Sequence, residues 1–276
     1  MARYGMVIDI NKCGGCYGCF IACKDEHCGQ EYPGYSAPQP MMGQFWMNVI
    51  EKERGTYPKV KTAHIAVPCM HCEDAPCVAK AKDGAVYRRE DGIVIIDPVK
   101  AKGQKQIVTA CPYRVIYWNE ELNLPQKCTF CANLIDEGWK EPRCVEMCPA
   151  DALMFGDLDD PNSEVSKLIK ANDTESFRPE FGLKESVFYI NLPKKFIAGT
   201  VADAESDEVA PNVTVTVSGE GKKFTQQTNG FGDFEFEGLA DNKTYTVTFA
   251  KQGYATQEMQ VKTSRDLNLG VIMMQK

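Results

Sequence analysis

The sequence predicts an α+β chain in two parts, a cysteine-rich module of short strands and helical turns followed by a small antiparallel β-sandwich. All 13 cysteines lie between Cys13 and Cys148, and residues 149–276 have none. From about residue 197, apolar and polar side chains alternate with period two. With 276 residues, 43% of them hydrophobic and 25% charged, the chain is expected to be globular with a buried core.

Charge and hydropathy argue against nucleic acid binding and against a membrane-spanning helix. The 31 basic and 38 acidic residues give a net charge of -7, and no cluster of Lys and Arg supplies the positive charge that nucleic acid binding requires. No run of 18 apolar residues occurs, so we expect no membrane-spanning helix. The first residues lack the apolar core of an export signal. We therefore expect a cytoplasmic location, with export on a partner's signal left open.

The first cysteine loop follows a predicted strand at residues 6–10. Residues 13–23 have the spacing C-x2-C-x2-C-x3-C, in which three thiolates hold one [4Fe-4S] cube and the fourth reaches a different cube. Glycines between the cysteines allow the tight turn that brings three sulfurs to three corners. The spacing therefore predicts three ligands of one cluster and one ligand of another.

A second cysteine block at residues 128–148 has the spacing C-x2-C-x12-C-x3-C. Alone, it would also suit a tetrahedral zinc ion. Beside the first block, each block supplies three ligands for one cube and a fourth for the other, so we favour clusters over zinc. Disulfides are disfavoured because 13 is odd and the C-x2-C spacing is too short for ordinary loop-closing bridges.

The middle of the chain is a copy of this arrangement. It begins like the second block, with Cys69, Cys72 and Cys77. Cys111 is followed by a proline and therefore resembles the last cysteine of a run. A predicted strand at residues 93–97 leads into the run that ends at Cys111. Residues 96–101 match residues 8–13 at three of six positions, which supports the register of an internal repeat.

One run of this repeat has lost its cysteines. The first run's spacing, counted back from Cys111, reaches Ala101, Gln104 and Ile107, and the second block's spacing, counted on from Cys77, reaches Ala81. These four positions would be the triplet and the reciprocal fourth ligand of one and the same cube. The sequence therefore predicts that one cube of four is deleted and three remain.

Twelve cysteines suffice for three [4Fe-4S] clusters. We predict Cys13, Cys16, Cys19 and Cys148 for cluster 1, Cys128, Cys131, Cys144 and Cys23 for cluster 2, and Cys69, Cys72, Cys77 and Cys111 for cluster 3.

Other residues carry weaker expectations. Cys28 is left over and is expected to be a small buried hydrophobe. His71, inside a cysteine loop, either donates a hydrogen bond to a cluster sulfur or decorates the surface. Trp46 and the other tryptophans are expected in the core or an interface. No nucleotide-binding, nucleophile-elbow or metalloprotease motif occurs, so no catalytic residue is predicted.

We expect the tandem ferredoxin-like module at residues 1–156, a connector at 157–196 and the sandwich at 197–276. A cysteine-free insertion of about residues 30–68 is too long for a plain connector and is expected to be a docking or covering loop. Within the connector, a helix is expected over residues 163–171, with Ser163 as its cap.

Alternating segments predict the strands of the sandwich. They occupy residues 213–217, 234–236 and 245–249, with turn residues at Asn229-Gly230 and Asp241-Asn242 between them. About 80 residues of this pattern predict a small antiparallel β-sandwich.

The cysteine layout with one emptied run resembles the iron-sulfur electron-transfer subunits of the dimethyl sulfoxide reductase family, the molybdopterin oxidoreductases. Within that family it is most similar to the small (beta) subunits of pyrogallol-phloroglucinol transhydroxylases. The likeness extends over residues 6–148 and is carried largely by residues that are not ligands. These are Glu31–Tyr35, Trp46–Asn48, Glu53–Pro58, Pro68–Cys72, Arg89–Val94 and Tyr117–Glu121. The tail resembles transthyretin-like or carboxypeptidase-regulatory-like modules in pattern.

The resemblance implies an electron-transfer subunit without an active site of its own. The reaction would take place on a molybdenum or tungsten bis-pterin cofactor in a large catalytic subunit, with polyhydroxylated aromatics as substrates, as in a pyrogallol hydroxytransferase. In a transhydroxylase the clusters would only set the redox poise, because hydroxyl transfer between rings involves no net oxidation. Two alternatives stay open, a reductive catechol dehydroxylase fed with electrons through this chain, and a free-standing polyferredoxin.

Overall fold

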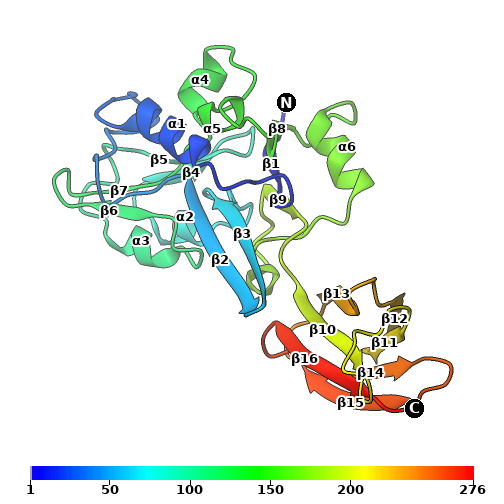
Figure 1. Ribbon diagram of the computed structural model, residues 1–276. Helices are drawn as coiled ribbons and strands as arrows, with labels where there is room; N and C mark the ends of the chain where they lie inside the picture. Colours follow the sequence, from blue (N-terminus) through cyan, green and yellow to red (C-terminus); the bar gives the residue numbers. More distant parts are fainter. Residues whose placement is uncertain (1) are drawn as a thin grey trace. The chain divides into compact units, whose positions relative to one another are not determined.

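The computed structural model describes residues 2–276, which form two compact units (Figure 1). The first unit comprises residues 2–52 and 63–192, and the second comprises residues 53–62 and 193–276. Each unit has a hydrophobic core of its own. No helix within the described residues is long and apolar enough to cross a membrane.

A three-stranded sheet of order β8-β1-β9 supports the first unit. Strand β1 (Tyr4–Asp9) pairs antiparallel with β8 (Leu153–Asp157) and parallel with β9 (Val187–Ile190). Met6, Val7 and Ile8 are all fully buried, so both faces of β1 are covered. The strand predicted at residues 6–10 is confirmed, and the segment expected to be a connector contributes β9 to this sheet.

Short helices follow the cysteine loops, as the run spacing predicts. Helix α1 (Gly18–His27) follows the first loop, and α2 (Pro76–Lys80) and α3 (Gln106–Ala110) belong to the middle copy. Helices α4 (Ala132–Asp136) and α5 (Arg143–Glu146) belong to the second block. Helix α1 packs against α5, and α2 packs against α3. The packing of α1 on α5 brings the first and last cysteine segments together.

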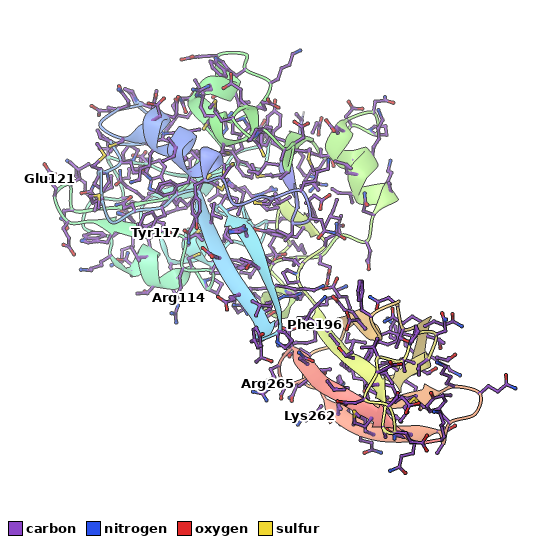
Figure 2. All side chains as sticks on the ribbon, in the orientation of Figure 1. Arg114, Tyr117, Glu121, Phe196, Lys262 and Arg265 are labelled. Carbon is purple, nitrogen blue, oxygen red and sulfur yellow. The ribbon has the colours of Figure 1, made fainter. Side chains whose placement is uncertain are left out.

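Two-stranded hairpins connect these elements. The insertion forms β2 (Asn48–Thr56) and β3 (Lys59–Val67), and two shorter hairpins are β4 (Val86–Arg88) with β5 (Val94–Ile96) and β6 (Tyr117–Asn119) with β7 (Leu124–Gln126). The strand predicted at residues 93–97 is confirmed as β5. Tyr117, labelled in Figure 2, is half-buried and donates its hydroxyl hydrogen to the Phe45 carbonyl at 3.0 Å, which connects the insertion to β6.

The helix expected over residues 163–171 is confirmed as α6 (Glu164–Ala171). Ser163 caps it, because its Oγ accepts the Ser166 N–H at 3.2 Å. A single 3-10 turn, η1 (Pro179–Phe181), follows before β9.

The second unit contains a β-sandwich of two sheets, ordered β13-β10-β16 and β12-β11-β14-β15. Alternate side chains of β11 and β14 are buried, which is the pattern that predicted them. The pairs are antiparallel apart from the parallel pair β10 with β16. The strands are β10 (Lys195–Asp203), β11 (Thr214–Gly219), β12 (Lys222–Gln227), β13 (Asp233–Leu239), β14 (Thr244–Ala250), β15 (Gln257–Lys262) and β16 (Leu267–Met274).

Two expectations about single residues have different outcomes. Trp46 is 1% exposed and lies in the core of the first unit, as expected. The expectation that Cys28 is buried is wrong, because Cys28 is only half-buried and its Sγ lies 3.9 Å from Met41 Sδ. Cys28 caps the end of α1, where the backbone becomes extended and leaves the core.

Candidate iron-sulfur centres

The four cysteines predicted for cluster 1 lie together. Burial, with smaller contributions from the nearby Cys13, Cys148 and Cys16, raises the pKa of Cys19 to about 12. The backbone N–H of Ala152 approaches Cys148 Sγ at 3.3 Å. A cysteine from the far end of the module thus joins three from the first loop.

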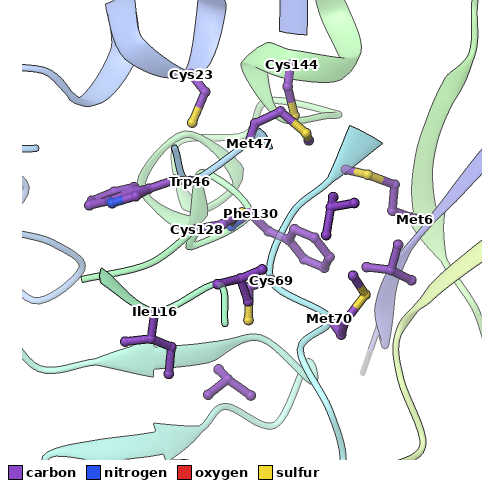
Figure 3. Packing of buried hydrophobic residues seen from close by; sticks show 14 of the residues in the cluster. Met6, Cys23, Trp46, Met47, Cys69, Met70, Ile116, Cys128, Phe130 and Cys144 are labelled. Carbon is purple, nitrogen blue, oxygen red and sulfur yellow. Dashed lines mark hydrogen bonds between the residues drawn. The ribbon is translucent and has the colours of Figure 1, made fainter. Parts of the chain in front are cut away.

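The four cysteines predicted for cluster 2 also gather, from three separate segments. Burial raises the pKa of Cys144 well above its ordinary value, with contributions from Cys131, Cys128 and Cys23. Burial has the same effect on the pKa of Cys23, to which Cys128 and Cys131 add. Figure 3 shows Cys23 and Cys144 extending into the core from α1 and α5. Cys23 therefore lies with the second block and not with the other cysteines of its own run.

The four cysteines predicted for cluster 3 line one cavity. About 330 Å³ of this space, part of it open to solvent, is free of protein atoms, and Cys69, Cys72, Cys77 and Cys111 border it with mainly apolar neighbours. Burial, with a smaller contribution from Cys69, raises the pKa of Cys77 to about 11.

The three sets form a row with the cluster 2 set in the middle. Cys19 of the cluster 1 set contributes to the raised pKa of Cys144. Burial, and after it Cys69 of the cluster 3 set, raises the pKa of Cys128 to about 11. The cluster 2 cysteines therefore neighbour both other sets, an order that run spacing alone does not define.

The cysteine loops share one backbone feature, a left-handed residue two positions after the first cysteine. Gly15, His71 and Phe130 have φ values of 70°, 44° and 54° at this position. In the second and third of these loops the N–H of that residue points at the first cysteine, with 3.4 Å from His71 N to Cys69 Sγ and from Phe130 N to Cys128 Sγ. Left-handed geometry at non-glycine residues is strained, and here it directs N–H groups at sulfur.

His71 is fully buried, so the expectation that it decorates the surface is wrong. Its Nδ1 accepts the Val94 N–H at 2.9 Å, and within residues 2–276 its Nε2 has no hydrogen-bond partner. The ring stacks on Phe130 with centroids 3.8 Å apart. Its backbone N–H, and not its ring, approaches a cysteine sulfur.

His27 is a site residue that the sequence reasoning missed. Its ring is 1% exposed, burial lowers its pKa to about 4, and its Nε2 lies 3.6 Å from Cys131 Sγ. The signal that would have found it is spacing, because Cys19, Cys23 and His27 are four residues apart and share one face of α1.

The donor sets fit iron-sulfur clusters chemically. Each set consists of four cysteines, and soft thiolates select iron-sulfur clusters, zinc or Cu(I). Burial raises the pKa of most of these thiols, so the thiolate forms need a compensating positive charge, which bound iron would supply. Among residues 2–276, no three His, Cys, Asp or Glu side chains form a group suited to a single metal ion.

The emptied run is filled by protein. Ala101 and Ile107 are fully buried in the core of the first unit. The Gln104 side chain makes two hydrogen bonds to the backbone of Lys82, the residue after Ala81. Its Oε1 accepts the Lys82 N–H at 2.9 Å, and its Nε2 donates to the Lys82 carbonyl at 3.2 Å. An amide pair thus joins the two segments that a fourth cube would have joined.

Comparisons with known proteins agree with this geometry. Residues 60–158 match the 4Fe-4S dicluster domain family, and residues 197–274 match the carboxypeptidase regulatory-like domain family. The chain is 44% identical over 279 aligned residues to the pyrogallol hydroxytransferase small subunit of Pelobacter acidigallici, with 99% of each chain covered.

Relatives with other reactions match over a shorter range. The arsenate respiratory reductase iron-sulfur subunit of a Shewanella species is 33% identical, over 68% of this chain and 96% of that one. A sulfite dehydrogenase subunit of Allochromatium vinosum is 36% identical, over 71% of this chain and 85% of that one. The chain therefore belongs to the family of iron-sulfur electron-transfer subunits of molybdopterin oxidoreductases.

Proposed function

We propose that the chain is the small subunit of a molybdenum or tungsten bis-pterin enzyme that acts on polyhydroxylated aromatics, and that it holds three [4Fe-4S] clusters. The observation that carries the proposal is the 44% identity with a pyrogallol hydroxytransferase small subunit over both units, tail included. The bis-pterin cofactor and the active site belong to a large catalytic partner. A cytoplasmic location stays a prediction.

The three cysteine sets support three clusters. Cluster 1 would be held by Cys13, Cys16, Cys19 and Cys148, cluster 2 by Cys128, Cys131, Cys144 and Cys23, and cluster 3 by Cys69, Cys72, Cys77 and Cys111. When bound, each cluster would carry one electron at a time. The anaerobically purified chain is expected to contain about twelve irons by this ligand count. A value near eight would remove one cluster from the proposal.

The reaction class is tested by turnover of the anaerobically co-purified complex on pyrogallol-type and catechol-type substrates, with and without an electron donor. Turnover without a donor is expected, because hydroxyl transfer between rings consumes no electrons and the clusters then hold the redox poise. Turnover that depends on a donor would instead indicate a reductive dehydroxylase supplied through this chain.

The row of cysteine sets favours the reductase as the second candidate. Neighbouring sets are close enough for their thiols to influence each other, as Cys19 with Cys144 and Cys69 with Cys128 show. A continuous row suits electron delivery, and relatives of this chain include subunits of an arsenate reductase and a sulfite dehydrogenase. A free-standing polyferredoxin would purify alone and without molybdenum or tungsten.

The insertion is our proposed contact with the large subunit. Met41 and Met42 are adjacent and are 71% and 80% exposed, and adjacent exposed apolar side chains suit contact with a partner. Met42→Glu is expected to weaken co-purification of the large subunit and leave the iron content unchanged. Val99→Glu, also at an exposed apolar position but outside the insertion, serves as the matched control.

A further inference from the structure

The histidine at the end of α1 lies against a predicted cluster ligand. His27 Nε2 is 3.6 Å from Cys131 Sγ, within reach of a hydrogen bond to sulfur. The ring is held in the core by Trp46, with centroids 4.9 Å apart, and by an edge contact with Tyr32 at 5.7 Å. His27 therefore has little freedom to turn its ring away from the sulfur.

The position of the hydrogen follows from the charge on the sulfur. A cysteine that ligates iron is a thiolate, which accepts hydrogen bonds and repels the lone pair of an imidazole nitrogen. The nitrogen that faces Cys131 therefore carries hydrogen. The other nitrogen, Nδ1, has no partner within the described residues, so no competing acceptor draws the hydrogen to the opposite side.

We propose that the His27 Nε2–H donates a hydrogen bond to the Cys131 sulfur and raises the reduction potential of cluster 2. The bond withdraws electron density from the ligand and so favours the more negative, reduced cluster. This inference rests on the proposed function, because it requires a cluster at Cys131.

The place of cluster 2 gives the bond a consequence for electron flow. The cluster 2 cysteines neighbour both other sets, so an electron that crosses the row passes through this centre. A raised potential makes the middle centre easier to reduce and lets it hold an electron between the two ends.

His71 provides the internal contrast. It is also fully buried beside a cysteine loop, but its Nδ1 accepts the Val94 N–H and its ring stacks on Phe130. The His71 ring thus lacks the contact with sulfur that the His27 ring makes.

The test is potentiometric titration of the whole chain, followed by electron paramagnetic resonance. In His27→Phe, one of three centres should be harder to reduce by about tenfold in its reduced-to-oxidised ratio, which is about 59 mV for one electron. His27→Gln keeps an N–H donor and should recover part of the shift. The affected centre should be the one whose spectrum changes in Cys131→Ser.

A second measurement needs no variant. In the wild-type chain with 15N-labelled histidine, pulsed spectra of reduced cluster 2 should contain a histidine nitrogen coupling and an exchangeable proton coupling. Absence of both couplings, or equal shifts in His27→Phe and His27→Gln, would overturn the inference alone. Absence of the Cys131 cluster from the wild-type chain would overturn the three-cluster function as well.

Discussion

Two copies of one loop, residues 8–23 and residues 96–111, differ in what fills them. Both begin with the same turn, in which an aspartate side chain accepts a hydrogen bond from the backbone N–H of the residue two positions later. The distance is 3.0 Å from Asn11 N to Asp9 Oδ1 and 2.8 Å from Val99 N to Asp97 Oδ1. The first copy then has four cysteines, which we predict to ligate two clusters, whereas the second has Ala101, Gln104 and Ile107 at the first three of these positions.

The comparison teaches that protein groups can occupy the place of one cluster. Apolar burial of Ala101 and Ile107 replaces the cube, and the Gln104 amide pair with Lys82 replaces its cross-link. Burial raises the pKa of the thiols in the first copy, so they become thiolates only when bound iron supplies the compensating positive charge. In the second copy, protein groups thus occupy the place of one cube, although its last residue, Cys111, is a predicted ligand of cluster 3.

Iron removal should give the largest effect, because both copies lie in the first unit with all three cysteine sets. Anaerobic extraction of iron with an oxidant and a chelator is expected to unfold the first unit, because three sets of cysteines from separate segments lose what joins them. The β-sandwich has its own core and should stay folded. Limited proteolysis with mass spectrometry would detect a resistant fragment near residues 197–276. Protection of residues 8–23 equal to that in the iron-loaded chain would contradict this view.

Restoring the lost ligands would break the distinction between the copies. A variant with Ala81→Cys, Ala101→Cys, Gln104→Cys and Ile107→Cys is expected to bind a fourth cube, because α2 and α3 already pack together and the turn is retained. Iron analysis after anaerobic reconstitution should rise from about twelve to about sixteen irons per chain. Cys28→Ala is the control and should leave the iron content unchanged, because Cys28 lies outside the three sets. An iron content that stays at about twelve in the four-cysteine variant would mean that the emptied run no longer has the geometry that a fourth cube requires.

Ile107→Ala tests the apolar part of the replacement. Ile107 is fully buried, so the truncation should lower the free energy of unfolding by about 2–5 kcal/mol. Urea unfolding of the iron-loaded chain measures this free energy. Val99 is 78% exposed, so the control Val99→Ala is expected to change the free energy of unfolding by less than about 0.5 kcal/mol. Iron content should be the same in both variants. A loss of iron in Ile107→Ala would tie this residue to a cluster after all.

Gln104→Ala tests the amide pair and should have a smaller effect. The two bonds to Lys82 are partly exposed, so their loss is expected to cost about 1–2 kcal/mol. Hydrogen exchange at the Lys82 amide should accelerate in the variant. Gln106→Ala removes a bond to the Gln104 side chain and leaves the Lys82 bonds in place, so the Lys82 amide should stay protected there.

The smallest expected effect comes from an ion pair, and its dependence on salt distinguishes it from the neutral hydrogen bonds of Gln104. Near the cluster 2 block, Arg89 bonds Asp136, which also accepts the Tyr35 hydroxyl of the insertion at 2.6 Å. The Arg89 guanidinium holds the pKa of Asp136 below its usual range. Asp136→Asn should cost less than about 1 kcal/mol in low salt and still less in high salt. The cost of Gln104→Ala, which removes a neutral contact, should not depend on salt.

Much of the site follows from local sequence. The run spacings predict which cysteines act together, the match of residues 8–13 with 96–101 predicts the copied turn, and period-two alternation predicts the sandwich strands. These features depend on neighbours within a few residues, where covalent geometry limits the alternatives. The cluster ligand sets themselves stay predictions until iron is measured.

The tertiary structure decided what depends on distant segments. The middle place of the cluster 2 cysteines, the pairing of β9 with β1, the contact of His27 with Cys131 and the exposure of Cys28 all involve packing between separate parts of the chain. Outside the cysteine runs, spacing along a sequence does not define which remote surfaces meet, because hydrophobic burial is non-directional and many pairings satisfy the same pattern. The sequence by itself thus determined the predicted cysteine sets, and the fold determined how the sets neighbour each other and which other groups surround them.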